Sequence, residues 1–369
     1  MAATPIDPRV AEHHCAAMRD IGANPNSLEH EAGAQAQAAL DRAATSVLRT
    51  LGSEADDVMF TPGASPALWL AVEDAIARVG GRRARIAATA VEHPSLLAAL
   101  RRAERDGRAS LVLLPVDQFA APRLDALENI LADGVDLLCT MAANNEVGTV
   151  SQLAAIGQLA VRHGVRHLVD ASQAAGRIDM TGAVLADLVV VSGAKIYGPR
   201  RTGALIGRIT SHAAGLGHDV FGSPDAPSAM ALAHALELRL IEGPEDERRI
   251  AAMRDRMQAR LLELVPGLAL NGDPVARLSG SLHVSTPHIS GEAAVSRLWG
   301  RVALSTGAAC QSGVPGPSHV LSAMDVPEWV RDGAVRIGVG RFNTDQELDD
   351  AAGLIAEALA QTVPARRYA

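Results

Sequence analysis

Aromatic residues are scarce in this sequence. Phe, Trp and Tyr make up only 2% of its 369 residues, whereas hydrophobic residues as a whole make up 48%. A sizeable buried core is therefore expected, and it has to be built mainly from Ala, Val and Leu. The length is roughly twice that of a typical single domain, which predicts two domains or one large α/β unit.

Cysteine is equally sparse, with Cys15, Cys139 and Cys310 spread along the chain. An odd number of distant cysteines argues against a disulfide framework and is typical of a reducing compartment, so we expect a cytoplasmic protein. No two of them have the spacing of zinc ligands, and no metal site is predicted. A lone cysteine is usually a small core residue, so any functional hypothesis must come from its surroundings.

Long apolar runs and an excess of positive charge are also missing. No hydrophobic stretch approaches the roughly 20 residues that a membrane-spanning helix needs. Residues 1–10 have no basic region followed by an apolar one, so neither a membrane span nor a secretory signal is expected. The net charge of −8 argues against direct binding to nucleic acid.

The sequence does contain a regular alternation of apolar strands and helices. It begins with an Ala-rich helix predicted over residues 30–51. Seven strands follow, with helices between most of them, and this rhythm is typical of a mostly parallel sheet covered on both faces. The strands are predicted at 57–60, 84–89, 110–114, 135–141, 166–169, 188–192 and 203–207.

A change of rhythm after the seventh strand indicates a smaller second domain. The predicted elements are a long helix at 227–264, a strand at 280–285, a loop at 305–317, a strand at 334–339 and a closing helix from Thr344. We expect a large domain of residues 11–250 and a small α+β domain formed by residues 1–10 and 251–369.

Two charged residues follow or end apolar strands. Lys195 closes the segment VVVSGAK, and Asp170 ends the segment HLVD. Taken alone, Lys195 could be a plain surface residue and Asp170 a helix N-cap. Together they indicate other roles, because a carboxylate buried at a strand end needs a cationic partner. A protonated pyridine nitrogen is such a partner, and the pairing strengthens the ring as an electron sink.

Three further motifs lie at the ends of predicted strands, where sites form in such sheets. The turn at 61–65 opens a helix whose N-terminal N–H groups suit a phosphate, although many strand-to-helix turns look alike. His93 precedes a helix, and it is alternatively a cap or a buried, satisfied histidine. Asn144 and Asn145 could simply form turn hydrogen bonds.

With these motifs in place, the sequence resembles a known family. Seven segments, in family order and at similar spacing, look like those of the cysteine desulfurases of the NifS/IscS type. These are class-V, fold-type-I enzymes that use pyridoxal phosphate (PLP). The likeness covers nearly the whole chain. The segments are FTPGAS (60–65), VEHPSLL (91–97), NNEVGT (144–149), DASQAAG (170–176), SGAKIYGP (192–199), STGAACQSG (305–313) and VRIGVGRFNT (335–344).

The resemblance implies PLP as cofactor, bound by a mostly parallel seven-stranded large-domain sheet with a smaller α+β domain beside it. Lys195 would carry the cofactor as a Schiff base and later move the substrate Cα proton, for which its amine has to be unprotonated. Asp170 would hold the ring nitrogen, and His93 would stack on the ring as an acid–base group. The other contacts would come from Gln173, Asn145, Ala64, Ser65 and Ser192.

The resemblance also implies the reaction, in which L-cysteine becomes L-alanine and a persulfide forms on Cys310. That residue lies in a stretch rich in Gly, Ser and Pro, which is typical of a mobile loop. Its thiolate would attack the substrate sulfur and pass it to a sulfur-acceptor protein. Arg336 would bind the substrate carboxylate, with Asn145 nearby. Ser223 would reach the phosphate of a neighbouring subunit, which implies a homodimer.

Two residues depart from the family pattern on the phosphate side. Ala194 stands where the family has a histidine, and Val220 stands where it has an arginine. The residues for carbon–sulfur chemistry are intact, so we expect an active enzyme with weaker cofactor retention. Two alternatives stay open: a related PLP lyase or aminotransferase, against which Cys310 argues, and a degenerate, non-catalytic scaffold. The acceptor is open among iron–sulfur assembly, thiolation of tRNA or DNA, and supply to a biosynthetic pathway.

Overall fold

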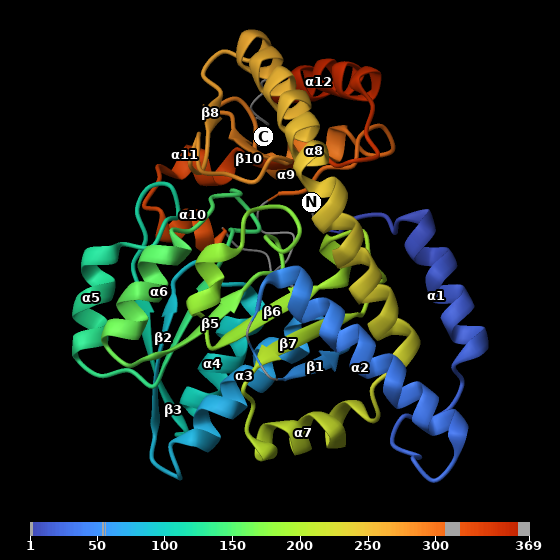
Figure 1. The fold of residues 1–369 in the computed structure, drawn as a ribbon. Helices are drawn as coiled ribbons and strands as arrows, with labels where there is room; N and C mark the ends of the chain where they lie inside the picture. Colours follow the sequence, from blue (N-terminus) through green and yellow to red (C-terminus); the bar gives the residue numbers. More distant parts are fainter. Residues whose placement is uncertain (1–2, 54, 56, 307–317, 361–369) are drawn as a thin grey trace, which may run out of the picture.

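The computed structural model describes residues 3–53, 55, 57–306 and 318–360 of the chain. Two sheets organise these residues (Figure 1). The larger sheet has seven strands in the order β1-β7-β6-β5-β4-β2-β3. They are β1 (Val58–Thr61), β2 (Ala84–Thr89), β3 (Ala109–Leu114), β4 (Leu137–Met141), β5 (Arg166–Asp170), β6 (Leu188–Ser192) and β7 (Gly203–Gly207).

The direction of the strands decides where a site can form. β6, β5, β4, β2 and β3 pair in parallel, whereas β7 runs antiparallel to β6 and β1 runs antiparallel to β7. β1 therefore points the same way as the parallel strands, and its carboxyl end lies at the same edge of the sheet. The expected seven-stranded, mostly parallel sheet is confirmed, and the predicted bounds of β2, β6 and β7 are met.

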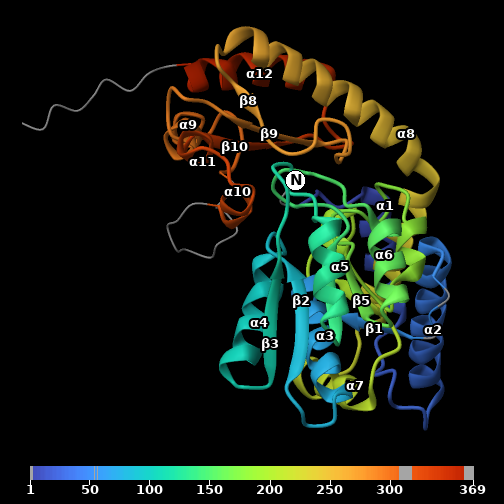
Figure 2. The same cartoon turned by 90° about the vertical axis from the view of Figure 1, so that its left-hand side faces the viewer.

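Helices cover both faces of the large sheet (Figure 2), as the buried run of β6 requires. Val189 and Val191 pack into a core with α1, α2 and α8, whereas Val190 packs into a core with α3 and α4. α5 and α6 pack against β2 and β4 in a further core. The helices are α1 (Pro8–Asp20), α2 (Glu31–Leu51), α3 (Ala64–Arg78), α4 (Pro94–Arg105), α5 (Leu124–Ala132), α6 (Leu153–Arg162), α7 (Ser211–Phe221) and α8 (Ala226–Leu264), with the 3-10 turns η1 (Thr181–Leu185) and η2 (Gly193–Lys195).

A smaller unit follows on a three-stranded sheet in the order β10-β9-β8. Its core joins the second half of α8 to β9, β10 and α12. α8 spans 39 residues and runs from α2, beside the large sheet, to α12, beside the small one (Figure 2). The remaining elements are β8 (Ala269–Leu270), β9 (Ser281–Ser285), α9 (Gly291–Arg297), α10 (His319–Ala323), α11 (Glu328–Asp332), β10 (Ala334–Gly338) and α12 (Asp345–Ala360).

Arg341, just beyond β10, ties the small unit to the large one. Its guanidinium donates hydrogen bonds to Asp7, at 3.1 Å, and to Glu242 of α8, at 2.6 Å. It also lies 5.4 Å from the ring centroid of Tyr197, two residues after Lys195. The small unit is thereby held against the segment that carries the lysine.

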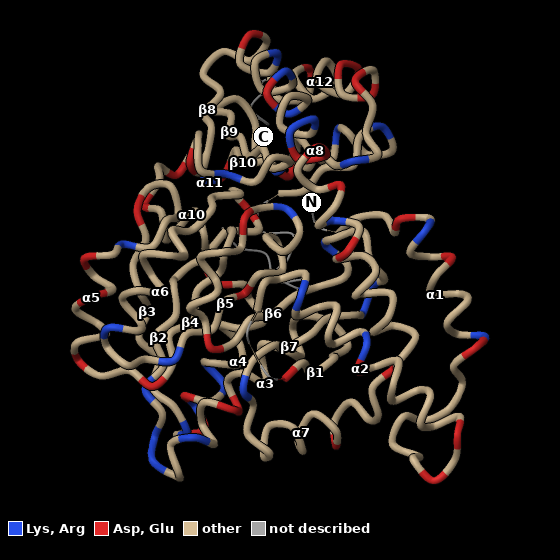
Figure 3. The backbone as a smooth tube through the Cα atoms, viewed as in Figure 1, with Lys and Arg blue, Asp and Glu red and all other residues tan. Residues whose placement is uncertain are grey.

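Charges of both signs are interspersed over the two units (Figure 3). None of the described helices is long and apolar enough to cross a bilayer.

Candidate active site

A cavity of about 170 Å³ lies at the carboxyl edge of the large sheet, where α/β proteins usually place their ligands. The eight residues of this chain that we predicted to contact the cofactor within one subunit all line it. The lining consists of Ala64, Ser65, Leu68, His93, Ser95, Met141, Ala143, Asn145, Asp170, Ser172, Gln173, Ser192 and Lys195. The fold therefore gathers into one space residues that the sequence spreads over 132 positions.

Adjacent parallel strands bring the carboxylate and the amine to this cavity. Asp170 is the last residue of β5 and is 6% exposed. Its Oδ1 accepts a hydrogen bond of 2.9 Å from the backbone N–H of Ser172. Residues 172–177 form turns, so the alternative of a helix N-cap for Asp170 is wrong. Lys195 ends η2, directly after the neighbouring strand β6.

His93 both caps α4 and lines the cavity. It is the N-cap of α4, where its Nδ1 accepts a hydrogen bond of 3.2 Å from the backbone N–H of Ser95. The same nitrogen lies 2.7 Å from the Ser95 hydroxyl, which leaves Nε2 as the ring nitrogen for the cavity. Burial lowers the pKa of His93, and the opposing charges of Asp170 and Lys195 raise and lower it respectively. The imidazole is therefore neutral at pH 7.

A buried acid beneath His93 was not recognised from the sequence. Glu92 is fully buried, and its Oε1 accepts hydrogen bonds from the Thr89 hydroxyl, at 2.6 Å, and from the Met141 N–H, at 2.8 Å. Burial raises the pKa of Glu92 to about 8, and the nearby Asp170 adds to this effect. Glu92 is therefore mostly protonated at pH 7. Only the tertiary structure reveals that this acid is buried.

The two amides after β4 have different tasks. The side-chain oxygen of Asn144 accepts hydrogen bonds from the N–H groups of Glu146, at 2.9 Å, and Val147, at 3.0 Å, which confirms the turn alternative for this residue. Asn145 lines the cavity instead. Its Oδ1 is buried and has no hydrogen-bond partner among the described residues, and the same holds for the Ser172 hydroxyl. Buried polar atoms of this kind can accept or donate hydrogen bonds to a ligand in the cavity.

The N-terminus of α3 supplies backbone donors at the same edge. α3 begins at Ala64, and its N-cap Gly63 has φ 109°, a conformation that favours glycine. Because the N-cap residue is a glycine, it has no side chain with which to cap these N–H groups. With Ala64 and Ser65 in the cavity wall, the helix end is suited to a phosphate.

Arg336 reaches the same loop from the small unit. It is a β10 residue, 5% exposed, and its Nη1 donates a hydrogen bond of 2.9 Å to the backbone carbonyl of Asn145. Its Nε and Nη2 both donate to the hydroxyl of Ser305, at 3.2 and 3.0 Å. Glu146 is buried nearby and accepts a hydrogen bond of 2.5 Å from Ser318. Burial raises the pKa of Glu146 to about 7, and the charge of Arg336 opposes that rise.

The remaining predicted residues do not line this cavity. Ser223 is exposed and borders a separate cavity, where its hydroxyl accepts a hydrogen bond of 3.1 Å from Asn26. Cys310 lies outside the described residues. Ala194 is half-buried beside Lys195, and Val220 is 59% exposed on α7.

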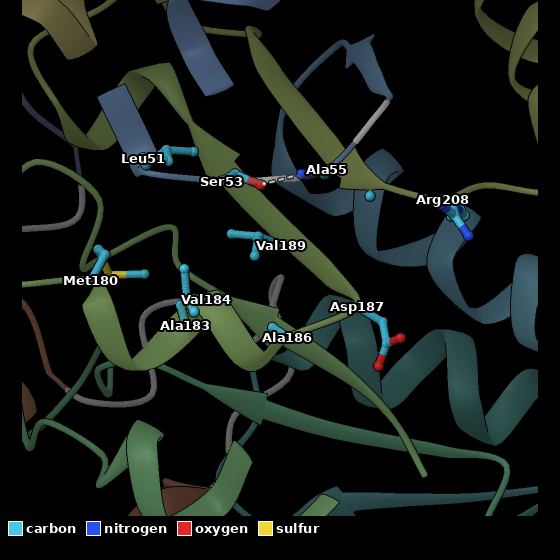
Figure 4. Close-up of a pocket in the computed structure, with 11 residues that line it drawn as sticks. Leu51, Ser53, Ala55, Met180, Ala183, Val184, Ala186, Asp187, Val189 and Arg208 are labelled. Atoms are coloured by element: carbon cyan, nitrogen blue, oxygen red, sulfur yellow. Dashed lines mark hydrogen bonds between the residues drawn. The ribbon is translucent and has the colours of Figure 1, made fainter. Parts of the chain in front are cut away.

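A second cavity, of about 280 Å³, lies at the opposite end of β6 (Figure 4). Its walls include Met180, Asp187, Val189 and Arg208. None of the predicted site residues lines it, and it lies near the amino end of a parallel strand, so we assign the functional site to the first cavity.

This chain is similar in sequence to known proteins of one enzyme family. Residues 1–215 match the aminotransferase class-V family. Cysteine desulfurase IscS of Shewanella baltica is 32% identical, over 97% of this chain and 91% of that protein. The cysteine desulfurase of Mus musculus is 31% identical, over 94% of this chain and 78% of that protein. The chain belongs to the class-V aminotransferase family.

Solved structures narrow the assignment. A NifS-like protein superimposes with a TM-score of 0.85 and 27% identity, covering 97% of each chain. DndA from Streptomyces lividans superimposes with a TM-score of 0.75 and 26% identity, over 92% of this chain and 98% of that one. Within the class-V aminotransferases, the chain is therefore a member of the cysteine desulfurase group, whose enzymes depend on PLP.

Proposed function

We propose that this protein is a cysteine desulfurase that binds PLP through Lys195 and transfers the sulfur of L-cysteine to Cys310. One observation carries the proposal: Lys195 lines the same cavity as Asp170, and it is the only lysine in the sequence. Arginine supplies every other fixed positive side-chain charge. A guanidinium stays protonated in proteins, whereas an amine can lose its proton and form a Schiff base.

The residues in the cavity fit PLP. Asp170 would pair with the ring nitrogen, Ser192 and the N-terminus of α3 would hold the phosphate, and the ring hydroxyl would meet Gln173 and the unpartnered Oδ1 of Asn145. His93 would stack on the ring. When bound, PLP supplies an electron sink for the Cα of an amino acid. The neutral Glu92 keeps a second negative charge away from Asp170.

The side chains around the cofactor would each perform one task. Arg336 would bind the substrate carboxylate, and the Lys195 amine would take the Cα proton. His93 would hold or give a proton at Nε2, because Ser95 occupies Nδ1. The Cys310 thiolate would attack the substrate sulfur, forming an S–S bond as the Cβ–S bond breaks. L-cysteine and a thiol thus give L-alanine and a persulfide, without an external oxidant.

The comparisons do not favour the alternative of another PLP lyase or aminotransferase, because curated relatives that cover 97% of the chain are cysteine desulfurases. The scaffold alternative rested on Ala194 and Val220. Both positions bear on the retention of PLP rather than on carbon–sulfur chemistry. The residues that we propose for that chemistry are all present in the sequence: Lys195, Asp170, His93, Cys310 and Arg336.

We further propose a homodimer that works in the cytoplasm, where a persulfide carrier would find reduced thiols. Ser223 lies outside the cavity of its own chain, in keeping with a role at the phosphate of a second subunit. The proposed division assigns residues 11–250 to the large domain, and 1–10 with 251–369 to the small one. The small core, whose first residue along the chain is Ile250, supports a boundary near residue 250, whereas Val10 packs in the core of the large sheet. The sulfur would pass from Cys310 to an acceptor protein.

A trapping experiment tests the proposed function. The purified protein is loaded with PLP, reduced with borohydride and digested, and mass spectrometry then locates the pyridoxyl group. We expect it on Lys195 alone, and we expect the Lys195→Ala variant to form no alanine from L-cysteine. A protein that neither binds PLP nor forms alanine would support the scaffold alternative instead.

A further inference from the structure

Ser305 holds the side chain of Arg336 through two donors at once. The serine hydroxyl oxygen accepts from Nε at 3.2 Å and from Nη2 at 3.0 Å. The backbones of the two residues also form a bridge, in which the N–H of Arg336 donates to the carbonyl of Ser305 at 2.8 Å. Ser305 therefore fixes both the backbone and the guanidinium of Arg336.

The hydrogen bonds of the guanidinium to described residues leave two of its donors for a ligand. The guanidinium carries five N–H groups in one plane. Nε and Nη2 use one each on Ser305, and Nη1 uses one on the carbonyl of Asn145. One N–H then remains on each terminal nitrogen, which is the set that a carboxylate can accept with its two oxygens.

The charge of Arg336 also points to an anionic ligand. Arg336 is 5% exposed, and the hydrogen-bond partners of its guanidinium in the described part of the chain are neutral oxygens. His283, its cross-strand neighbour on β9, is uncharged because burial lowers its pKa to about 3. Glu146, also buried nearby, has a pKa of about 7 and is only partly ionised at neutral pH, so it offsets part of the Arg336 charge. An anionic ligand that accepts hydrogen bonds directly from the guanidinium would offset the rest.

We propose that Ser305 is a positioning residue, whose hydroxyl sets the orientation in which Arg336 meets the α-carboxylate of L-cysteine. This inference rests on the proposed function. An arginine side chain has many rotamers, and fixing one before the substrate arrives removes that entropic cost from binding. Because the carboxylate is bound throughout the reaction, Ser305 acts on substrate affinity rather than on the chemical step.

The test compares Ser305→Val with Ser305→Thr in the PLP-loaded enzyme. The two variants have the same shape, and only threonine keeps the hydroxyl. We expect Ser305→Val to raise KM for L-cysteine roughly tenfold with little change in kcat, since a hydrogen bond to a charged group is lost. Ser305→Thr should stay close to the wild type. Equal KM values for the two variants would overturn the inference.

A binding measurement separates positioning from damage to the fold. L-alanine and ethylamine are titrated against the visible absorbance of the enzyme, because ethylamine is L-alanine without its carboxylate. Ser305→Val should weaken L-alanine and leave ethylamine unaffected. Ser285→Ala is the matched control: Ser285 is a buried β9 serine whose hydroxyl donates to the Val330 carbonyl at 2.6 Å. It should lower stability without a shift in KM.

Arg336→Ala distinguishes the two possible failures. If this variant binds L-alanine as tightly as the wild type does, the proposed role of Arg336 is wrong and the role of Ser305 falls with it. If Arg336→Ala weakens L-alanine and Ser305→Val does not, the proposed function stands and only the positioning role is refuted.

Discussion

Arg336 of the small unit donates a 2.9 Å hydrogen bond to the backbone carbonyl of Asn145 in the large unit, 191 residues earlier in the chain. This hydrogen bond joins the proposed donor to the substrate carboxylate with the loop that borders the proposed cofactor pocket. Because the acceptor is a backbone atom, the Asn145 side chain can be changed without removing it. The side-chain oxygen is buried and has no partner in the described part of the protein.

We expect Asn145→Ala to separate activity from stability. The variant should have a kcat/KM for L-cysteine that is lower by roughly tenfold or more, because the proposed hydrogen bond between Asn145 and the ring hydroxyl of PLP is lost. The stability of the PLP-free protein should change little, since the lost oxygen has no protein partner among the described residues. Urea unfolding and steady-state kinetics check this. A large loss of stability would show that Asn145 is structural.

Glu92→Gln should change how stability depends on pH. The folded state holds the pKa of Glu92 at about 8, above its ordinary value of 4.5. Between these values the unfolded chain is ionised while the folded one is mostly protonated, so rising pH favours unfolding of the wild type. Gln is neutral in both states, and its Oε1 can accept the bonds from Thr89 and Met141. The variant should gain stability relative to the wild type as pH rises from 4.5 to 8.

Urea unfolding at pH 5 and pH 8 measures the effect. The gain at pH 8 over pH 5 should be on the order of 1–3 kcal/mol, given the size that such pKa shifts imply. Glu347 is a control: it lies on the surface of α12, where hydrogen bonds, first from the Thr344 N–H, lower its pKa. Glu347→Gln should show no such gain. A gain for Glu92→Gln that is equal at both pH values would contradict the buried, protonated state.

Ala194→His should strengthen retention of PLP. Ala194 is half-buried, and its carbonyl is fixed by the N–H of Thr4 at 2.9 Å. An imidazole placed there could donate to the phosphate, which should tighten PLP binding roughly tenfold. The measurement is loss of visible absorbance on dialysis, with Ala194→Asn as a shorter polar control. Equal retention by the wild type and Ala194→His would reject the missing phosphate contact.

The regular part of the fold could be predicted from local patterns. β6 could be predicted from its run of four apolar residues, which the structure buries on both faces of the sheet. α8 could be predicted from its long helical pattern. α7 was missed, since Gly215 and Gly217 weaken its helical propensity. The reason for Gly217 is tertiary: a Cβ there would come within 3.0 Å of the Met59 sulfur. The reversed direction of β7 is likewise set by pairing and not by its composition.

Some residues of the candidate site could likewise be predicted from the sequence, whereas others could not. Lys195, Asp170 and His93 could be found because motifs at strand ends converge on one edge. Glu92, Glu146 and Ser305 could not, because their burial and partners arise only when distant segments meet. The sequence carries one further signal for Lys195, because it is the only lysine in the chain. A Schiff base with a lysine side chain can therefore form only at this residue.

The transfer of sulfur to Cys310 is tested most directly by mapping the persulfide. The PLP-loaded enzyme is mixed with L-cysteine, its thiols are alkylated at once, and the peptides are examined by mass spectrometry. Cys15 is exposed on α1 and Cys139 is buried in β4, so they serve as internal controls. The account predicts one added sulfur atom on Cys310 and none on the other two. A persulfide on Cys15 instead, or alanine formation that persists in Cys310→Ala, would contradict it.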